Sequence, residues 1–162
     1  MFTLQVLLRG AGSRIKVTPF VEKFGLNAFV VAPTAIIAGV ASSLGMRVLR
    51  VPGATGDYST DLLAKANAVL HTLFATPLSS PSPSTAATTA AGCRWSGEGE
   101  RGEANGFDFA FLHVKAVDDA GHDKDVALKV HFLQQIDHMI GSIRSRVERL
   151  QAFDADLEAS IA

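Results

Sequence analysis

The sequence predicts an α/β fold with a mainly parallel sheet and helices on both faces. Short apolar runs alternate with longer helical patterns, glycine and proline separate them, and the order is strand, helix, strand, helix, strand, helix. A length of 162 residues and a hydrophobic content of 48% suffice for the core of one domain. In open sheets of this kind, functional sites lie beyond the carboxyl ends of the strands.

Three short apolar runs predict strands in the first half of the chain. They are Leu4–Leu8, ending in a glycine turn, Phe29–Ala32, ending before Pro33-Thr34, and Arg47–Val51, ending at Pro52-Gly53. The Ala, Ile and Val-rich stretch after Thr34 predicts a helix that stops at Leu44-Gly45. A further helix, capped by Ser59 or Thr60, should run to about Phe74, because its apolar positions recur with the spacing of one buried face.

The segment from Pro77 to Gly106 differs sharply in composition from the rest. It is rich in Ser, Pro, Thr and Ala, then in Gly and Glu, and Trp95 is its large apolar residue. Such a segment buries too little apolar surface to offset its ordering entropy, so we expect a flexible insertion within a single domain spanning 1–162. Cys93, the one cysteine, lies in this segment and excludes an intramolecular disulfide.

The last part of the chain predicts a strand at Phe107–Val114, an acidic loop, and a long helix from about Asp125 to Leu150. Apolar residues at steps of three and four predict the buried stripe of this helix. They are Val126, Val130, Leu133, Ile136, Ile140, Ile143 and Val147.

Asp118 and His122 form a candidate metal-ligating pair directly after the last predicted strand. They are four residues apart, which suits a helical turn or a tight loop. Mn²⁺ and Mg²⁺ accept carboxylate oxygen, and Mn²⁺ and Zn²⁺ accept imidazole nitrogen, so the pair is half of a plausible ligand shell. The residues alone leave open the alternative of solvated acids beside a structural histidine.

Several other polar residues near these positions are weaker site candidates. Strict strand geometry would place Lys115 and Asp118 on opposite faces, unless the loop after the strand changes their placement. His113, amid apolar neighbours, is expected to be a satisfied core histidine. His131 and His138 share one helix face without a metal-ligating partner and are expected at the helix surface.

The loop 51–61 and Arg9 are candidate anion contacts. The paired glycines of the loop allow close approach to a ligand, and the start of the helix that follows favours phosphate. Thr55 adds a hydroxyl. A plain strand-to-helix turn is the alternative. Arg9 could bind a phosphate or carboxylate, or lie as a solvated turn residue.

The overall charge and hydropathy narrow the classes of partner. A net charge of −1 gives no electrostatic reason to expect nucleic acid or an anionic membrane, and no apolar run is long enough to span a bilayer. Small molecules are the expected partners. The expected compartment is the cytoplasm, with an organelle as the alternative if the chain continues before Met1.

Several motifs together resemble the archaeal-type cofactor-independent phosphoglycerate mutases of the alkaline phosphatase-like metalloenzyme superfamily. The resemblance covers nearly the whole chain outside Pro77–Gly106. It is carried by Leu7–Gly12, Pro19-Phe20, Glu22–Gly25, Gly39–Ala41, Leu44–Met46, Pro52–Gly56 with Thr60-Asp61 and Lys65, and Lys115–Asp123.

The resemblance implies an alkaline phosphatase-like α/β core and interconversion of 3-phosphoglycerate and 2-phosphoglycerate through a phosphoserine, without bisphosphoglycerate. It implies two divalent metals, Mn²⁺ or Mg²⁺ with Zn²⁺ or Co²⁺ as alternatives, and matches Asp118 and His122 to ligands of one of them. It also implies substrate contacts for Arg9, Thr55 and Lys115.

The chain departs from the family pattern in two respects. The nucleophilic serine and the remaining metal ligands of the family fall in segments with no counterpart here, and Ala38 stands where the family often has lysine. The resemblance therefore implies part of a mutase, with no catalytic nucleophile of its own. A metal-dependent phosphohydrolase of the same superfamily and an inactive metal-binding remnant are the alternatives.

Overall fold

The structure, a computed structural model, describes residues 17–74, 94–96 and 106–161. Within these residues four strands form one sheet in the order β3-β2-β1-β4. The strands are β1 (Ala28–Val31), β2 (Arg47–Arg50), β3 (Arg94–Ser96) and β4 (Phe109–Leu112). β1 pairs in parallel with β2 and with β4, whereas β3 runs antiparallel to β2. The predicted mainly parallel sheet is therefore confirmed.

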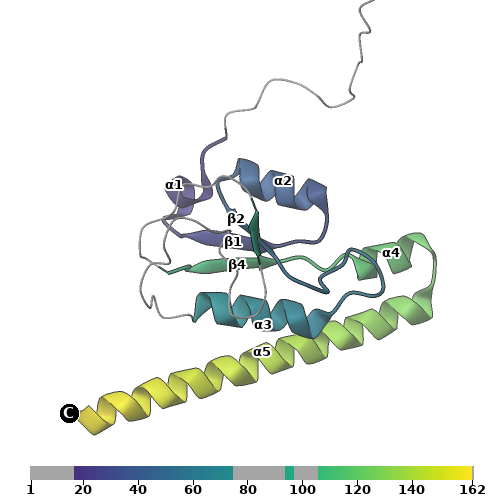
Figure 1. Cartoon of the computed structure of the whole chain (residues 1–162). Helices are drawn as coiled ribbons and strands as arrows, with labels where there is room; N and C mark the ends of the chain where they lie inside the picture. The colour runs from purple at the N-terminus through teal and green to yellow at the C-terminus, as the bar shows by residue number, and fades with distance from the viewer. Residues whose placement is uncertain (1–16, 75–93, 97–105, 162) are drawn as a thin grey trace, which may run out of the picture.

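Helices cover both faces of the sheet (Figure 1). They are α1 (Phe20–Phe24), α2 (Ala35–Ser43), α3 (Leu62–Leu73), α4 (Ala116–His122) and α5 (Val126–Ile161). Figure 1 shows α1 and α2 on one face of the sheet and α3 on the other, with α5 forming an outer layer along α3. None of the described helices is both long and apolar enough to cross a membrane.

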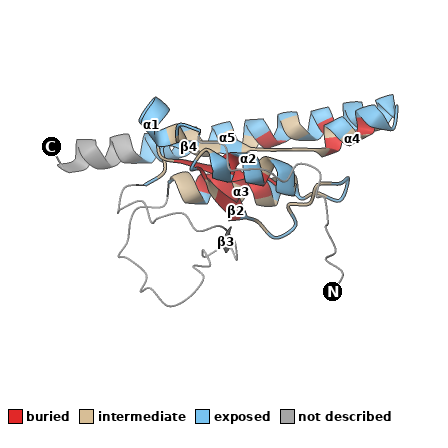
Figure 2. Cartoon of the chain, turned by 90° about the horizontal axis from the view of Figure 1, so that it is seen from above, coloured by how far each residue is buried: buried red, intermediate tan, exposed pale blue. Residues whose placement is uncertain are grey.

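The core consists of two clusters, one on each face of β1. All four residues of β1 are buried, as expected for a strand between two parallel neighbours. Val30 points into the cluster with α2, and Phe29 and Val31 point into the cluster with α3, in keeping with the two-residue period of a strand. Figure 2 shows these buried residues on the sheet and on the helix surfaces that face it.

Two local predictions are corrected by the structure. The segment after β4 is the helix α4 and not an acidic loop, and the side chain that caps α3 is that of Asp61 and not of Ser59 or Thr60. The Asp61 carboxylate accepts a hydrogen bond from the Ala64 amide at 2.8 Å. A carboxylate at this position satisfies an amide that the helix itself leaves unpaired.

The predicted buried stripe of α5 is wrong at four positions, because Val126, Val130, Leu133 and Ile140 are exposed. Phe132 and Met139 are buried instead, and the remaining predicted positions, Ile136, Ile143 and Val147, are half-buried. α5 therefore carries two apolar stripes, and periodicity alone does not say which of them faces the domain.

Two further predictions fall largely outside the described residues. These are the strand at Leu4–Leu8 and the insertion at Pro77–Gly106. Within the insertion, however, Arg94–Ser96 forms β3.

Candidate metal centre

The candidate metal pair lies on α4, at the carboxyl end of β4. β4 ends at Leu112, and α4 begins four residues later at Ala116. Ala116 and Ala120 are fully buried, so their spacing fixes which face of α4 packs against the domain. Asp118 and His122 are turned outward, with side chains that are 62% and 76% exposed.

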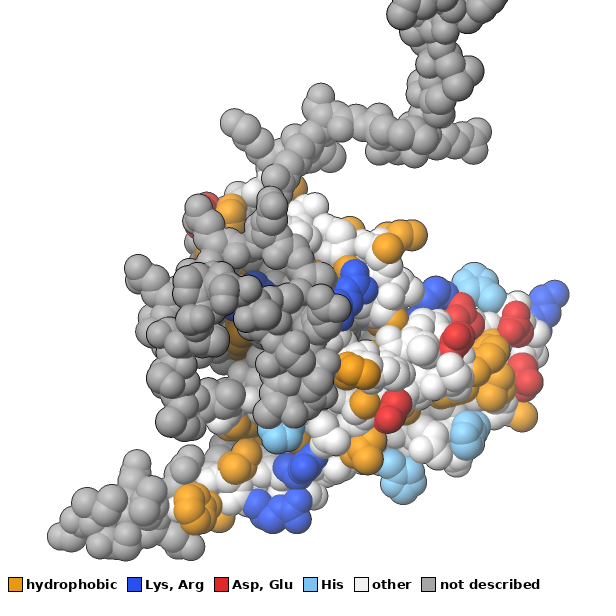
Figure 3. All heavy atoms as spheres, viewed as in Figure 1, with side chains coloured by type: hydrophobic (Ala, Val, Ile, Leu, Met, Phe, Trp, Pro, Cys, Tyr) orange, Lys and Arg blue, Asp and Glu red, His pale blue; other side chains and the backbone are white. Residues whose placement is uncertain are grey.

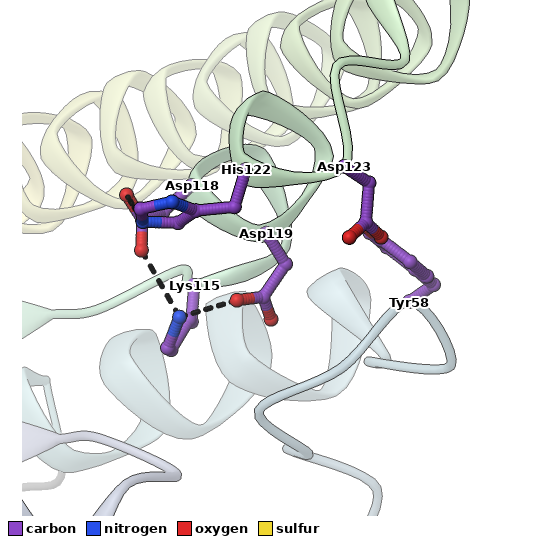
Figure 4. Close-up of polar contacts among 6 residues, drawn as sticks. All are labelled: Tyr58, Lys115, Asp118, Asp119, His122 and Asp123. Atoms are coloured by element: carbon purple, nitrogen blue, oxygen red, sulfur yellow. Dashed lines mark hydrogen bonds and ion pairs between the residues drawn. The ribbon is translucent and has the colours of Figure 1, made fainter.

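Asp118 and His122 lie close enough to share one cation. The His122 Nε2 atom is 3.6 Å from the Asp118 Oδ1 atom, and Figure 4 shows both side chains at the same surface of α4. An oxygen and an imidazole nitrogen fit Mn²⁺, Zn²⁺ or Co²⁺ as a partial shell. Among the described residues no third histidine, cysteine or acid joins them in a metal-holding group, so the pair accounts for only part of a complete shell.

Lys115 binds the acids of this surface directly. Its Nζ atom lies 3.0 Å from Asp118 Oδ2 and also contacts Asp119 Oδ1 (Figure 4). Lys115 and Asp118 do not lie on opposite faces, because the backbone is already helical at Lys115. Its hydrogen bond lowers the pKa of Asp118, while hydrogen bonds to Asp119 and Asp118 raise the pKa of Lys115. Asp118 is therefore ionised at neutral pH, as a metal ligand must be.

Tyr58 links the loop 51–61 to this surface, a contact for which the sequence held no signal. The Tyr58 hydroxyl donates to Asp123 Oδ2 at 2.6 Å across 65 residues of chain, and its ring stacks on Phe132 of α5 with a centroid distance of 5.8 Å. The hydrogen bond to Asp123 raises the pKa of Tyr58 to about 12. The loop, α4 and α5 are thus held together at one point.

The loop 51–61 is organised by Asp57. The Asp57 carboxylate accepts from the Thr55 hydroxyl at 2.7 Å and from the Ser59 hydroxyl and amide at 2.6 and 2.9 Å. Hydrogen bonds from Ser59 and Thr55 lower the pKa of Asp57 to about 2. Thr55, predicted as a substrate contact, therefore has its hydroxyl engaged within the loop. Arg9, the other predicted anion contact, lies outside the described residues.

Several buried polar atoms lie in or beneath the loop 51–61, and they were not predicted from the sequence. Lys65 is fully buried, and its Nζ atom lies 3.4 Å from the carbonyl oxygens of Thr55 and His113. Thr34 Oγ1, Thr60 Oγ1 and His113 Nδ1 are buried with no hydrogen-bond partner in the described structure. We call Thr34, Thr60, Lys65 and His113 the strand-end cluster. The expectation that His113 is a satisfied core histidine is therefore wrong.

Burial dominates the electrostatics of the strand-end cluster. Desolvation lowers the pKa of Lys65, and desolvation together with the charges of Lys65 and Lys115 lowers the pKa of His113.

Ala38, which stands where the family often has lysine, is buried in the core cluster that contains Val30. His131 and His138 are exposed on α5, as predicted.

Comparisons with known proteins agree with the motif resemblance. Residues 100–153 match the Metalloenzyme superfamily, and this stretch includes Asp118 and His122. The mixed α/β fold, with three parallel strands flanked by helices, is consistent with that superfamily.

Two curated relatives are named 2,3-bisphosphoglycerate-independent phosphoglycerate mutase. The protein from Sulfurisphaera tokodaii is 33% identical over 142 residues, which is 88% of this chain and 27% of the relative. The protein from Saccharolobus solfataricus is 35% identical over 89% of this chain and 27% of its own length. The chain thus spans about a quarter of the length of these relatives.

A solved structure is also similar to most of the chain. The PH0037 protein from Pyrococcus horikoshii superimposes with a TM-score of 0.58 at 30% identity, over 79% of this chain and 26% of the other. The chain therefore matches the Metalloenzyme superfamily over residues 100–153 and, over nearly its whole length, is similar to about a quarter of the length of archaeal proteins named 2,3-bisphosphoglycerate-independent phosphoglycerate mutase.

Proposed function

We propose that this chain is the part of a cofactor-independent phosphoglycerate mutase that supplies Asp118 and His122 to a two-metal centre. The observation that carries the proposal is the 3.6 Å approach of these side chains at the carboxyl end of a parallel strand. The reaction is the interconversion of 3-phosphoglycerate and 2-phosphoglycerate, a step of glycolysis and gluconeogenesis, without bisphosphoglycerate. When bound, Mn²⁺ or Mg²⁺ neutralises phosphate oxygens and orients the nucleophile.

Contacts within the chain leave one oxygen of Asp118 open and hold the helix that carries the pair. Lys115 engages Oδ2 of Asp118, which leaves Oδ1, the oxygen beside His122, as the atom available to a cation. The Tyr58–Asp123 hydrogen bond fixes the end of α4 against the loop. Lys115, Arg9 and Thr55 are proposed as substrate contacts. No residue of this chain is assigned as nucleophile.

The metal-binding step can be tested on the chain alone by titration with Mn²⁺. We expect weak but measurable binding, because two ligands provide only part of a shell. Asp118→Ala and His122→Ala should each lower the affinity by about a hundredfold or more, since even supporting residues of metal sites contribute tenfold to a hundredfold. Asp119→Ala is the matched control, one residue away, and should leave the affinity within a few fold of wild type. Unchanged Mn²⁺ binding in Asp118→Ala would exclude this ligand pair.

The reaction is tested separately by following 3-phosphoglycerate. Formation of 2-phosphoglycerate identifies a mutase, whereas release of inorganic phosphate identifies a phosphohydrolase. The isolated chain should show neither, because it has no assigned nucleophile and only a partial metal shell.

A further inference from the structure

Lys65 is a buried cation without a counter-charge among the described residues. No carboxylate of that part of the chain lies within ion-pair distance of its Nζ atom, and its contacts are the two carbonyl oxygens at 3.4 Å. A buried ammonium is costly unless an opposite charge compensates it. Polar carbonyls at this distance provide little compensation, so Lys65 calls for an anionic partner.

The other members of the strand-end cluster gather at the same end of the sheet. Thr34 follows β1, Thr60 closes the loop after β2, and His113 follows β4. The loop joins them, because the Thr55 carbonyl accepts from Lys65 and a Cβ added at Gly56 would lie 3.4 Å from the Thr34 methyl group. In Figure 1 this loop and the carboxyl end of β4 lie at the end of the domain that carries α4.

The free groups of the strand-end cluster are those that bind an anion. The ammonium can only donate, and the two hydroxyls and the imidazole can each donate a hydrogen bond. The nearby carboxylates are already used, since Asp57 accepts from its own loop and Asp61 caps α3. Buried polar groups in a folded protein normally have hydrogen-bond partners, which include waters and ions, and a water would not neutralise Lys65.

We propose that Lys65, Thr34, Thr60 and His113 form an anion-binding site for a phosphate group, beside the Asp118–His122 pair. The carboxyl ends of parallel strands are the usual place for such a ligand. Thr34, Thr60 and His113 are half-buried as residues, and Asp57, Tyr58 and Ser59 of the covering loop are exposed, so the site lies just beneath the surface. The choice of phosphate rests on the proposed mutase function, whereas the need for an anion does not.

The test is a titration of the full chain with inorganic phosphate, with chloride at equal ionic strength as the reference. Binding is measured by calorimetry and by the amide shifts of Thr60 and His113. We expect saturable binding and a loss of about tenfold or more in Lys65→Met, because charge-assisted hydrogen bonds to phosphate are the strong ones. Lys23→Met removes an exposed lysine of α1 and should bind as wild type does. Phosphate binding that persists in Lys65→Met, or its absence in the wild-type chain, overturns the proposal.

A second variant separates a binding role from a structural one. Thr60→Val keeps the shape of the side chain and removes the unpartnered hydroxyl. We expect it to weaken phosphate binding while raising the Tm in phosphate-free buffer, because a buried hydroxyl without a partner destabilises the empty site. A Thr60→Val variant with lowered Tm and unchanged phosphate affinity contradicts the assignment.

Two comparisons keep this proposal distinct from the mutase function. Lys65→Met should retain the Mn²⁺ affinity of wild type, so a failure of phosphate binding and a failure of metal binding are seen independently. Glycerate, which lacks the phosphate group, should not displace inorganic phosphate. Equal binding of glycerate would identify the site as a carboxylate site and overturn the phosphate assignment.

Discussion

Two lysines at the same end of the sheet have opposite surroundings. Lys115 has a side chain that is 31% exposed and pairs with Asp118 and Asp119, whereas Lys65 is fully buried and meets only carbonyl oxygens among the described contacts. The acids raise the pKa of Lys115, and burial lowers that of Lys65. Figure 3 shows the acids gathered with a histidine at the α4 end of the surface. The exposed region is thus suited to a cation and the buried one to an anion.

The largest stability effect expected from this contrast is at Lys65. Lys65→Met should raise the free energy of unfolding by about 1–2 kcal/mol in phosphate-free buffer, because replacing buried charge by an apolar side chain is often stabilising. Urea denaturation measures it, with Lys23→Met as the control that should not change. A destabilisation of about 3–5 kcal/mol would instead mean that Lys65 already has an anionic partner in the fold.

Variants at Asp61 test the cap of α3, the helix that carries Lys65. Asp61→Ala removes the carboxylate that accepts from the Ala64 amide and should cost about 0.5–2 kcal/mol. Asp61→Asn retains a capping oxygen and should lose much less. Equal losses in the two variants, measured by thermal denaturation, would show that the charge and not the cap is what matters.

Lys115 provides the counterpart of Lys65 in the exposed region. Lys115→Met should leave the Tm nearly unchanged, because ion pairs at the surface contribute little to stability. It should raise Mn²⁺ affinity a few fold, since the competing cation is removed from Asp118 Oδ2. Weaker Mn²⁺ binding in this variant would mean that Lys115 positions the ligand and does not compete for it.

The smallest expected effect is the pH dependence of stability that arises from Asp57 in the loop 51–61. The pKa of Asp57 is lowered from 3.8 to about 2, so its ionised form is favoured in the folded chain. The resulting stabilisation is present above the ordinary pKa and is lost as the pH falls through about 2. Asp57→Asn should therefore flatten the acid limb of the stability curve in this range. An unchanged acid limb would show that other carboxylates control it.

The order of β1, α2, β2, α3, β4 and α5 could be predicted from the sequence, because strand and helix periodicities are local, whereas the short elements α1, β3 and α4 were not predicted. β1, α2 and β2 fall within a few residues of their expected bounds. The exposed stripe of α5 could not be predicted, since Val126, Val130, Leu133 and Ile140 have the same periodicity as a buried face. Which stripe is buried depends on α3 and on Tyr58, which lie far away in the sequence.

The candidate site was only partly predictable for the same reason. The spacing of Asp118 and His122 is local, so their approach could be expected on a helical turn. The strand-end cluster joins residues from three separated segments, and the lack of partners for its hydroxyl and imidazole groups arises only when the chain is folded. The pairing of Tyr58 with Asp123 is likewise a contact across 65 residues.

The most direct test of the central claim is a mutase assay in which this chain replaces the matching 142 residues of the Sulfurisphaera tokodaii relative. We predict that the chimera converts 3-phosphoglycerate to 2-phosphoglycerate in the presence of Mn²⁺, and that Asp118→Ala in the chimera lowers the rate by about a hundredfold or more. A folded chimera that is inactive, or one whose activity is unaffected by Asp118→Ala, would contradict the account.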